Sequence, residues 1–227
     1  MIDETTLKGR IVAAALRLAA EKPWRDVTLA DIADRAGVGL ADVRQHFATK
    51  IAILFAFARE IDDEMLRAVP RRTSGQSTRD ALFEVIMSRF DRLASYRPAL
   101  KSIVGSGLPD PAMARSLLRT QHWMLEAAGV DTGRPGGLVR TAGLASVYAS
   151  VMRTWLDDDD PGLARTMAAL DRRLRSGERS LRTLDDLAGV ACRLASIVVP
   201  GCRRRASRTQ SQRPEADTDT LSTGPAA

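Results

Sequence analysis

The stretch IADRAGVGLADVRQHFATK, residues 32–50, decides the fold of the N-terminal part of this chain. Its small apolar residues recur at the spacing of two short helices that cross at a tight turn, and they are Ile32, Ala33, Ala36, Val38 and Val43. Gly37 supplies the left-handed residue that ends the first helix, and Phe47 plugs the core behind the second. The stretch therefore predicts a helix-turn-helix whose second helix, residues 40–46, is exposed.

Helical periodicity continues on both sides of this stretch, and it predicts an all-α protein of nine or ten helices. Thr5 or Thr6 is expected to cap a first helix that Pro23 ends, and Thr28 to cap the next. Further helices are expected at residues 49–69, 78–94, 97–105, 111–128, 137–156, 161–176 and 180–198. The predicted organisation is a helix-turn-helix head (1–50), a ligand-binding and dimerisation bundle (51–199) and a disordered tail (200–227).

Composition limits the classes of function. The 227 residues are 44% hydrophobic and carry 34 Lys and Arg against 28 Asp and Glu, but residues 1–50 hold eight basic and seven acidic side chains. Bulk charge therefore gives no argument for nucleic-acid binding. The N-terminus lacks the apolar segment of a signal peptide and no long apolar run is present, so a cytoplasmic protein is expected.

The residue pattern gives little evidence for a metal site, a cofactor site or an enzyme. Cys192 and Cys202 lack zinc-ligand spacing. The run Asp157–Asp160 is expected to punctuate helices, with Asp160 as the cap and Pro161 in the first turn. The two histidines, His46 and His122, have no Ser or Cys partner at a known spacing, and no Gly-rich phosphate loop precedes a helix. We expect neither an enzyme nor a bound metal or cofactor.

The pattern TLADIADRAGV…LADVRQHFATK, at the start of an all-helical chain of this length, resembles the TetR family of bacterial one-component regulators. The resemblance is close over residues 10–54 and architectural beyond. It implies a homodimer that binds a palindromic double-stranded DNA operator, with helices 137–156 and 161–174 at the dimer interface. It also implies a bundle that binds a small ligand, which moves the fourth helix and releases DNA.

Seven residues are expected to contact DNA: Thr28, Leu40, Ala41, Arg44, Gln45, His46 and Lys50. Thr28 and Lys50 would contact phosphate, whereas Arg44 and Gln45 would read bases. The sequence departs from the family pattern at Gly39, Leu40, Asp42 and Arg44, where Ser or Thr, a small or basic residue, Thr or Ser, and Tyr are usual. Asp42 would repel phosphate, so a retained scaffold that no longer binds DNA is the alternative.

Apolar residues in the second half predict a pocket for a small apolar ligand, and the expected lining is Phe83, Met87, Phe90, Trp123, Met124, Tyr148 and Met152. Ordinary core packing is the alternative. Residues 79–100 and 154–174 resemble a TetR-shaped group that includes the lipid-binding accessory protein of ubiquinone biosynthesis. This second resemblance implies binding of a lipid or isoprenoid without DNA. The apolar stripe and Arg cluster of Leu181–Arg205 would then contact a membrane surface, or else pack as a bundle helix.

Overall fold

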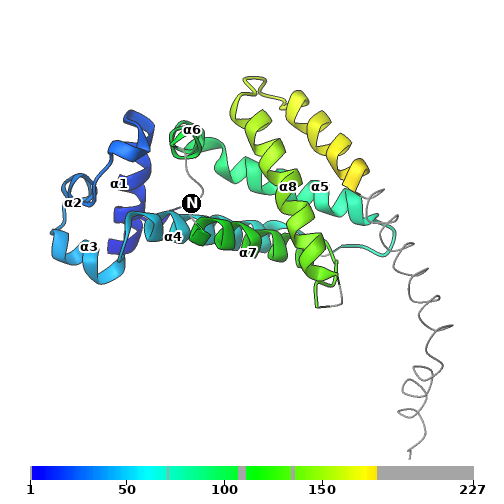
Figure 1. The fold of residues 1–227 in the computed structure, drawn as a ribbon, viewed down its shortest axis with the longest axis horizontal. Helices are drawn as coiled ribbons and strands as arrows, with labels where there is room; N and C mark the ends of the chain where they lie inside the picture. The colour runs from blue at the N-terminus through cyan, green and yellow to red at the C-terminus, as the bar shows by residue number, and fades with distance from the viewer. Residues whose placement is uncertain (1, 71, 107–110, 134–135, 178–227) are drawn as a thin grey trace, which may run out of the picture. The chain divides into compact units, whose positions relative to one another are not determined.

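A computed structural model describes residues 2–70, 72–106, 111–133 and 136–177, and these residues form helices joined by turns, with no strand among them (Figure 1). The predicted all-α class is confirmed. Several expectations concern residues that the structure does not describe. These are the helix 180–198, the tail 200–227, the membrane segment Leu181–Arg205 and both cysteines.

The head consists of α1 (Leu7–Glu21), α2 (Leu29–Ala36) and α3 (Leu40–His46), with a short 3-10 turn at Trp24–Asp26 between α1 and α2. Thr6 caps α1, because its Oγ1 accepts a hydrogen bond from the Gly9 amide at 3.0 Å. The three helices lie together and α4 leads away from them (Figure 1). The helix starts expected from the sequence are thus correct here, whereas the 3-10 turn was not expected.

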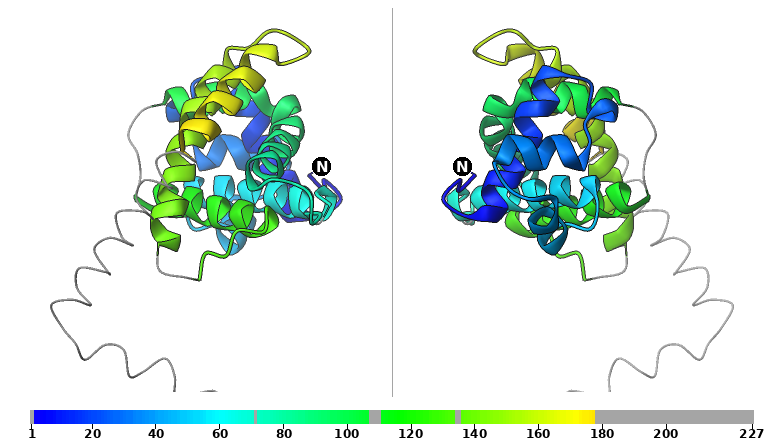
Figure 2. Two further views of the ribbon diagram at one scale, coloured as in Figure 1. Left: turned by 90° about the vertical axis from the view of Figure 1, so that its right-hand side faces the viewer. Right: turned by 90° about the vertical axis from the view of Figure 1, so that its left-hand side faces the viewer.

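The bundle consists of α4 (Lys50–Ala68), α5 (Thr78–Leu93), α6 (Arg97–Gly105), α7 (Pro111–Ala127) and α8 (Gly137–Leu156). A further helix follows at residues 164–177 and returns past α8 (Figures 1 and 2). It begins later than expected, because the Asp160 carboxylate accepts from the amides of Gly162 (3.1 Å) and Ala164 (3.0 Å) and holds Pro161 in a turn.

One continuous hydrophobic core runs through the head and the bundle. α1 packs against α2, α4 and α6, while α4 also packs against α5 and α7. In the bundle, the Phe90 ring stacks on Tyr148 and on Trp155, with ring centroids 5.3 and 5.2 Å apart. The head is therefore anchored on bundle helices.

The aspartates that follow α8 bond to different groups of the structure. Asp157 pairs with Lys101 Nζ at 2.7 Å, and the buried Asp158 accepts from the amide (2.8 Å) and hydroxyl (2.6 Å) of Thr166. These bonds lower the pKa of both carboxyl groups. The described part of the chain contains no cluster suited to a metal ion and no helix long and apolar enough to cross a membrane.

Candidate nucleic-acid interface and ligand cavity

The turn between α2 and α3 fixes how the exposed helix is presented. Gly37 has a φ of 66°, a left-handed conformation that favours glycine. The amide of Val38 then donates to the Ala33 carbonyl at 3.1 Å, which closes a Schellman motif at the end of α2. Ile32 and Val43 are fully buried beneath the crossing. The turn therefore sets α3 rigidly on its support helix.

The outward face of α3 carries the residues that the sequence assigned to DNA. Five of them are exposed: Leu40, Ala41, Arg44, Gln45 and His46. Leu40 is 53% exposed. Within the described residues, neither Arg44 nor Gln45 uses its side chain in a hydrogen bond or ion pair, so both are available to a partner.

Asp42, the residue that weakened the expectation of DNA binding, has a role inside the head. Its Oδ2 accepts a hydrogen bond from the Gly39 amide at 3.0 Å at the start of α3. A carboxylate in the first turn of a helix is also favoured by the helix dipole. Asp42 therefore caps α3, where its negative charge stabilises the helix that carries Arg44.

Thr28 begins α2 in a complete capping box. Its Oγ1 accepts from the Asp31 amide at 3.1 Å, while Asp31 Oδ2 accepts from the Thr28 amide and from Lys22 Nζ, both at 2.8 Å. The Lys22 bond, followed by the bonds from Thr28, lowers the pKa of Asp31 to about 2. Thr28 itself is exposed at this helix N-terminus, a position suited to phosphate.

Lys50 is held inside the head. Its Nζ donates to the carbonyls of Trp24 (2.7 Å) and Val27 (2.6 Å) and lies 4.7 Å from the Trp24 ring centroid. Burial lowers the pKa of its ammonium. The phosphate contact expected of Lys50 stays a prediction. In the structure, the hydrogen bonds of the Lys50 ammonium connect the 3-10 turn to α4.

The same turn is also bonded to α6. The Trp24 amide donates to Ser102 Oγ at 2.9 Å, and Ser102 Oγ donates to the Lys22 carbonyl at 3.2 Å. Lys50 and Ser102 thus tie one short turn of the head to two bundle helices. Sequence periodicity gave no sign of this junction, because its three parts are separated by up to 80 residues.

The residues expected to line an apolar pocket lie in different surroundings, and their part in ligand binding stays a prediction. Phe90, Met124 and Tyr148 are buried in the core, and the partly buried members of the set are Phe83, Met87 and Met152, which pack against that core. Trp123 is 46% exposed and does line a cavity.

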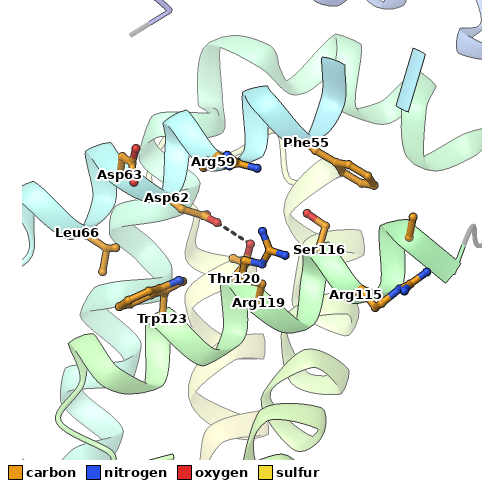
Figure 3. Close-up of a pocket in the computed structure, with 11 residues that line it drawn as sticks. Phe55, Arg59, Asp62, Asp63, Leu66, Arg115, Ser116, Arg119, Thr120 and Trp123 are labelled. Carbon is orange, nitrogen blue, oxygen red and sulfur yellow. Dashed lines mark hydrogen bonds between the residues drawn. The ribbon is translucent and has the colours of Figure 1, made fainter. Parts of the chain in front are cut away.

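That cavity, of about 610 Å³, lies between α4 and α7 (Figure 3). α4 supplies Phe55, Arg59, Asp62, Asp63 and Leu66, and α7 supplies Ala112, Arg115, Ser116, Arg119, Thr120 and Trp123. Sequence reasoning missed the three arginines because it searched for apolar positions. The one-turn spacing of Arg115 and Arg119 on a predicted helix was the available signal.

A buried polar network forms the floor of this cavity. Asp62 Oδ1 accepts from Arg89 Nε at 2.9 Å, and Oδ2 accepts from Thr120 Oγ1 at 2.6 Å, the bond drawn in Figure 3. Arg89 in turn donates to the Tyr148 hydroxyl. Burial raises the pKa of Tyr148, so this phenol stays neutral. The network links α4, α5, α7 and α8 across their shared core.

The sequence of the head and the fold of the chain are both similar to those of known proteins. Residues 11–57 match the sequence model of the bacterial regulatory proteins of the tetR family. The chain has a TetR-like fold, and its head is similar to the tetR-family model. A TetR transcriptional regulator from Nitrosomonas europaea is 26% identical, and the match covers 76% of this chain and 98% of that one with a TM-score of 0.60.

Two more distant structures agree in fold. A TetR transcriptional regulator from Rhodococcus sp. RHA1 is 21% identical, with coverages of 77% and 97% and a TM-score of 0.57. A tetR-family regulator from Streptomyces coelicolor is 18% identical, with coverages of 84% and 91% and a TM-score of 0.54. No curated protein sequence matches the chain. These comparisons give no support to the resemblance with the ubiquinone-biosynthesis accessory protein.

Proposed function

We propose that this protein is a homodimeric DNA-binding transcriptional regulator whose DNA affinity responds to a small ligand. The observation that carries the proposal is the exposed face of α3, with Arg44 and Gln45 unpaired within the described residues, in a head that matches the tetR family model. A rigid turn and a buried core under that face are what a recognition helix needs to enter a major groove.

DNA contacts divide between reading and positioning. Arg44 and Gln45 are adjacent in the second half of α3 and can donate to base edges, Arg44 preferring guanine and Gln45 adenine. Thr28 at the start of α2 positions phosphate. The Asp42 carboxylate accepts a hydrogen bond from the Gly39 amide within the head. Because this bond explains why an acidic residue stands there, Asp42 is compatible with DNA binding by Arg44 and Gln45.

The outer face of α8 supports a homodimer. Its exposed residues over three turns are uncharged and mostly small or apolar: Leu138, Val139, Ala142, Gly143, Ser146 and Ala149. A helix face that meets only water normally carries charges, whereas small residues allow two helices to approach closely. On the following helix, 164–177, Met167 is also exposed, at 38%. Together the two helices supply half of a four-helix interface.

α4 is the element that would carry a ligand signal. Asp62, on the cavity floor, and Lys50, on the head turn, are twelve residues apart on this one helix, about 18 Å at 1.5 Å per residue. A ligand that shifts α4 against α7 therefore displaces the turn that supports α1 and α2. The two heads of a dimer would then lose the spacing that successive major grooves require.

Selection of bound fragments from genomic DNA tests the proposal. The purified full chain is expected to enrich a palindrome, and Arg44→Ala is expected to lose about 1–3 kcal/mol of binding and specificity at one base position in each half-site. Arg119→Ala, which removes an arginine from the bundle cavity, serves as the matched control and keeps wild-type enrichment. Absence of any enriched sequence contradicts the proposal.

A further inference from the structure

We infer that the cavity between α4 and α7 binds an anionic amphiphile, a carboxylate carried on an apolar tail, as the regulatory ligand. The inference rests on the proposed ligand-responsive regulator and names the chemical class of its ligand. It adds a negative charge to the small apolar ligand expected from the sequence, because the residues that line the cavity include three arginines.

The charges around the cavity favour an anion. Arg59 on α4 and Arg119 on α7 come from opposite walls (Figure 3), and neither forms a hydrogen bond or ion pair with a described residue. Arg115, one turn before Arg119, donates only a long 3.4 Å bond to the Pro111 carbonyl. Guanidinium groups bind carboxylates through paired, charge-assisted hydrogen bonds. A carboxylate between α4 and α7 therefore finds donors on both helices.

The two acidic residues of the lining do not offset these arginines. The Asp62 carboxylate is neutralised by the buried Arg89 guanidinium at 2.9 Å and also accepts from Thr120. Asp63 is exposed and forms no ion pair within the described residues. The lining thus holds three arginines against one uncompensated carboxylate, and a cationic ligand would meet a net positive wall.

The remaining surface suits an apolar tail. Phe55 and Leu66 are half-buried on α4, and Trp123 on α7 leaves 46% of its surface exposed. Leu66 and Trp123 lie at one end of the cavity and Phe55 lies at the other (Figure 3), so a tail laid against either end would cover apolar surface that water now contacts. The volume of about 610 Å³ lies within the range of roughly 300–1,000 Å³ that holds small ligands.

Binding of decanoate to the purified full chain, measured by calorimetry, tests the inference against decanol and decylamine as neutral and cationic probes of similar tail length. Decanoate is expected to bind most tightly. Arg119→Gln is expected to weaken decanoate about tenfold and to leave decanol unchanged. Asp63→Asn is expected to tighten decanoate, since it removes the opposing charge. Trp123 fluorescence should change on binding, because Trp24 and Trp155 are buried elsewhere.

Ligand binding and DNA binding are separated by two variants. Arg44→Ala is expected to lose DNA and to bind decanoate as the wild type does. Arg119→Gln is expected to keep DNA binding and to lose its decanoate-dependent release. The inference is overturned if decanoate does not bind, if decanol or decylamine binds as tightly, or if Arg119→Gln leaves decanoate affinity unchanged. Failure to enrich any DNA sequence contradicts the proposed regulator and leaves the binding comparison intact.

Discussion

Leu40 places an exposed apolar side chain at the first position of α3, next to the residues proposed to read bases. In the major groove, the one apolar feature of a base edge is the thymine methyl group, which aliphatic side chains contact. We predict that Leu40 contacts a thymine. Replacing the thymines of the selected operator with uracil, one at a time, should lower wild-type affinity at one position per half-site. Leu40→Ala should be insensitive to the same replacement.

Asp31 couples the stability of the head to pH. Its pKa in the folded chain is about 2, below the ordinary 3.8, so its contribution to stability is complete above pH 3.8 and is lost as pH falls toward 2. We expect Asp31→Asn to flatten this acid limb of the stability curve. Urea unfolding followed by circular dichroism at a series of pH values measures the free energy of unfolding of the wild type and of Asp31→Asn. The prediction is wrong if both proteins lose stability in parallel over that window.

Among the elements, α4 and α5 are joined by the buried Asp62–Arg89 pair, whose members are 8% and 5% exposed. Removing one member of such a pair leaves the other buried without its counter-charge. We predict that Asp62→Leu or Arg89→Met lowers the free energy of unfolding by about 3–5 kcal/mol. The double variant should lose less than the sum of the two. Chemical denaturation of all four proteins gives the coupling energy, and strict additivity would contradict the prediction.

The helices were predictable from the sequence because their boundary signals are local. Thr6, Thr28 and Gly37 each act within four residues, and the structure places α1 and α2 where these signals do. The cavity and the head junction were not predictable, because they depend on which helices face each other. Asp62 and Thr120 bond across 58 residues. Apolar periodicity assigned Phe90 to a pocket lining, with ordinary core packing as the alternative, and the structure buries it in the core. Periodicity alone could not separate core from pocket.

At the scale of the whole molecule, DNA binding by two heads depends on the proposed dimer. Ser146 lies among uncharged exposed residues of α8, between Gly143 and Ala149, where a partner helix would approach closely. An arginine there would bury an unpaired charge at the interface. We predict that Ser146→Arg converts the dimer to a monomer and abolishes tight binding to the palindrome, since one head contacts only one half-site.

Sedimentation equilibrium and operator binding measure the two effects of Ser146→Arg on the same samples. Ala114→Arg, an exposed small-to-arginine change on α7, is the matched control and is expected to stay dimeric. Circular dichroism should show Ser146→Arg fully helical, because its side chain projects outward and the core behind α8, including Tyr148 and Val151, is untouched. A dimer that survives Ser146→Arg would mean that the outer face of α8 is not the interface.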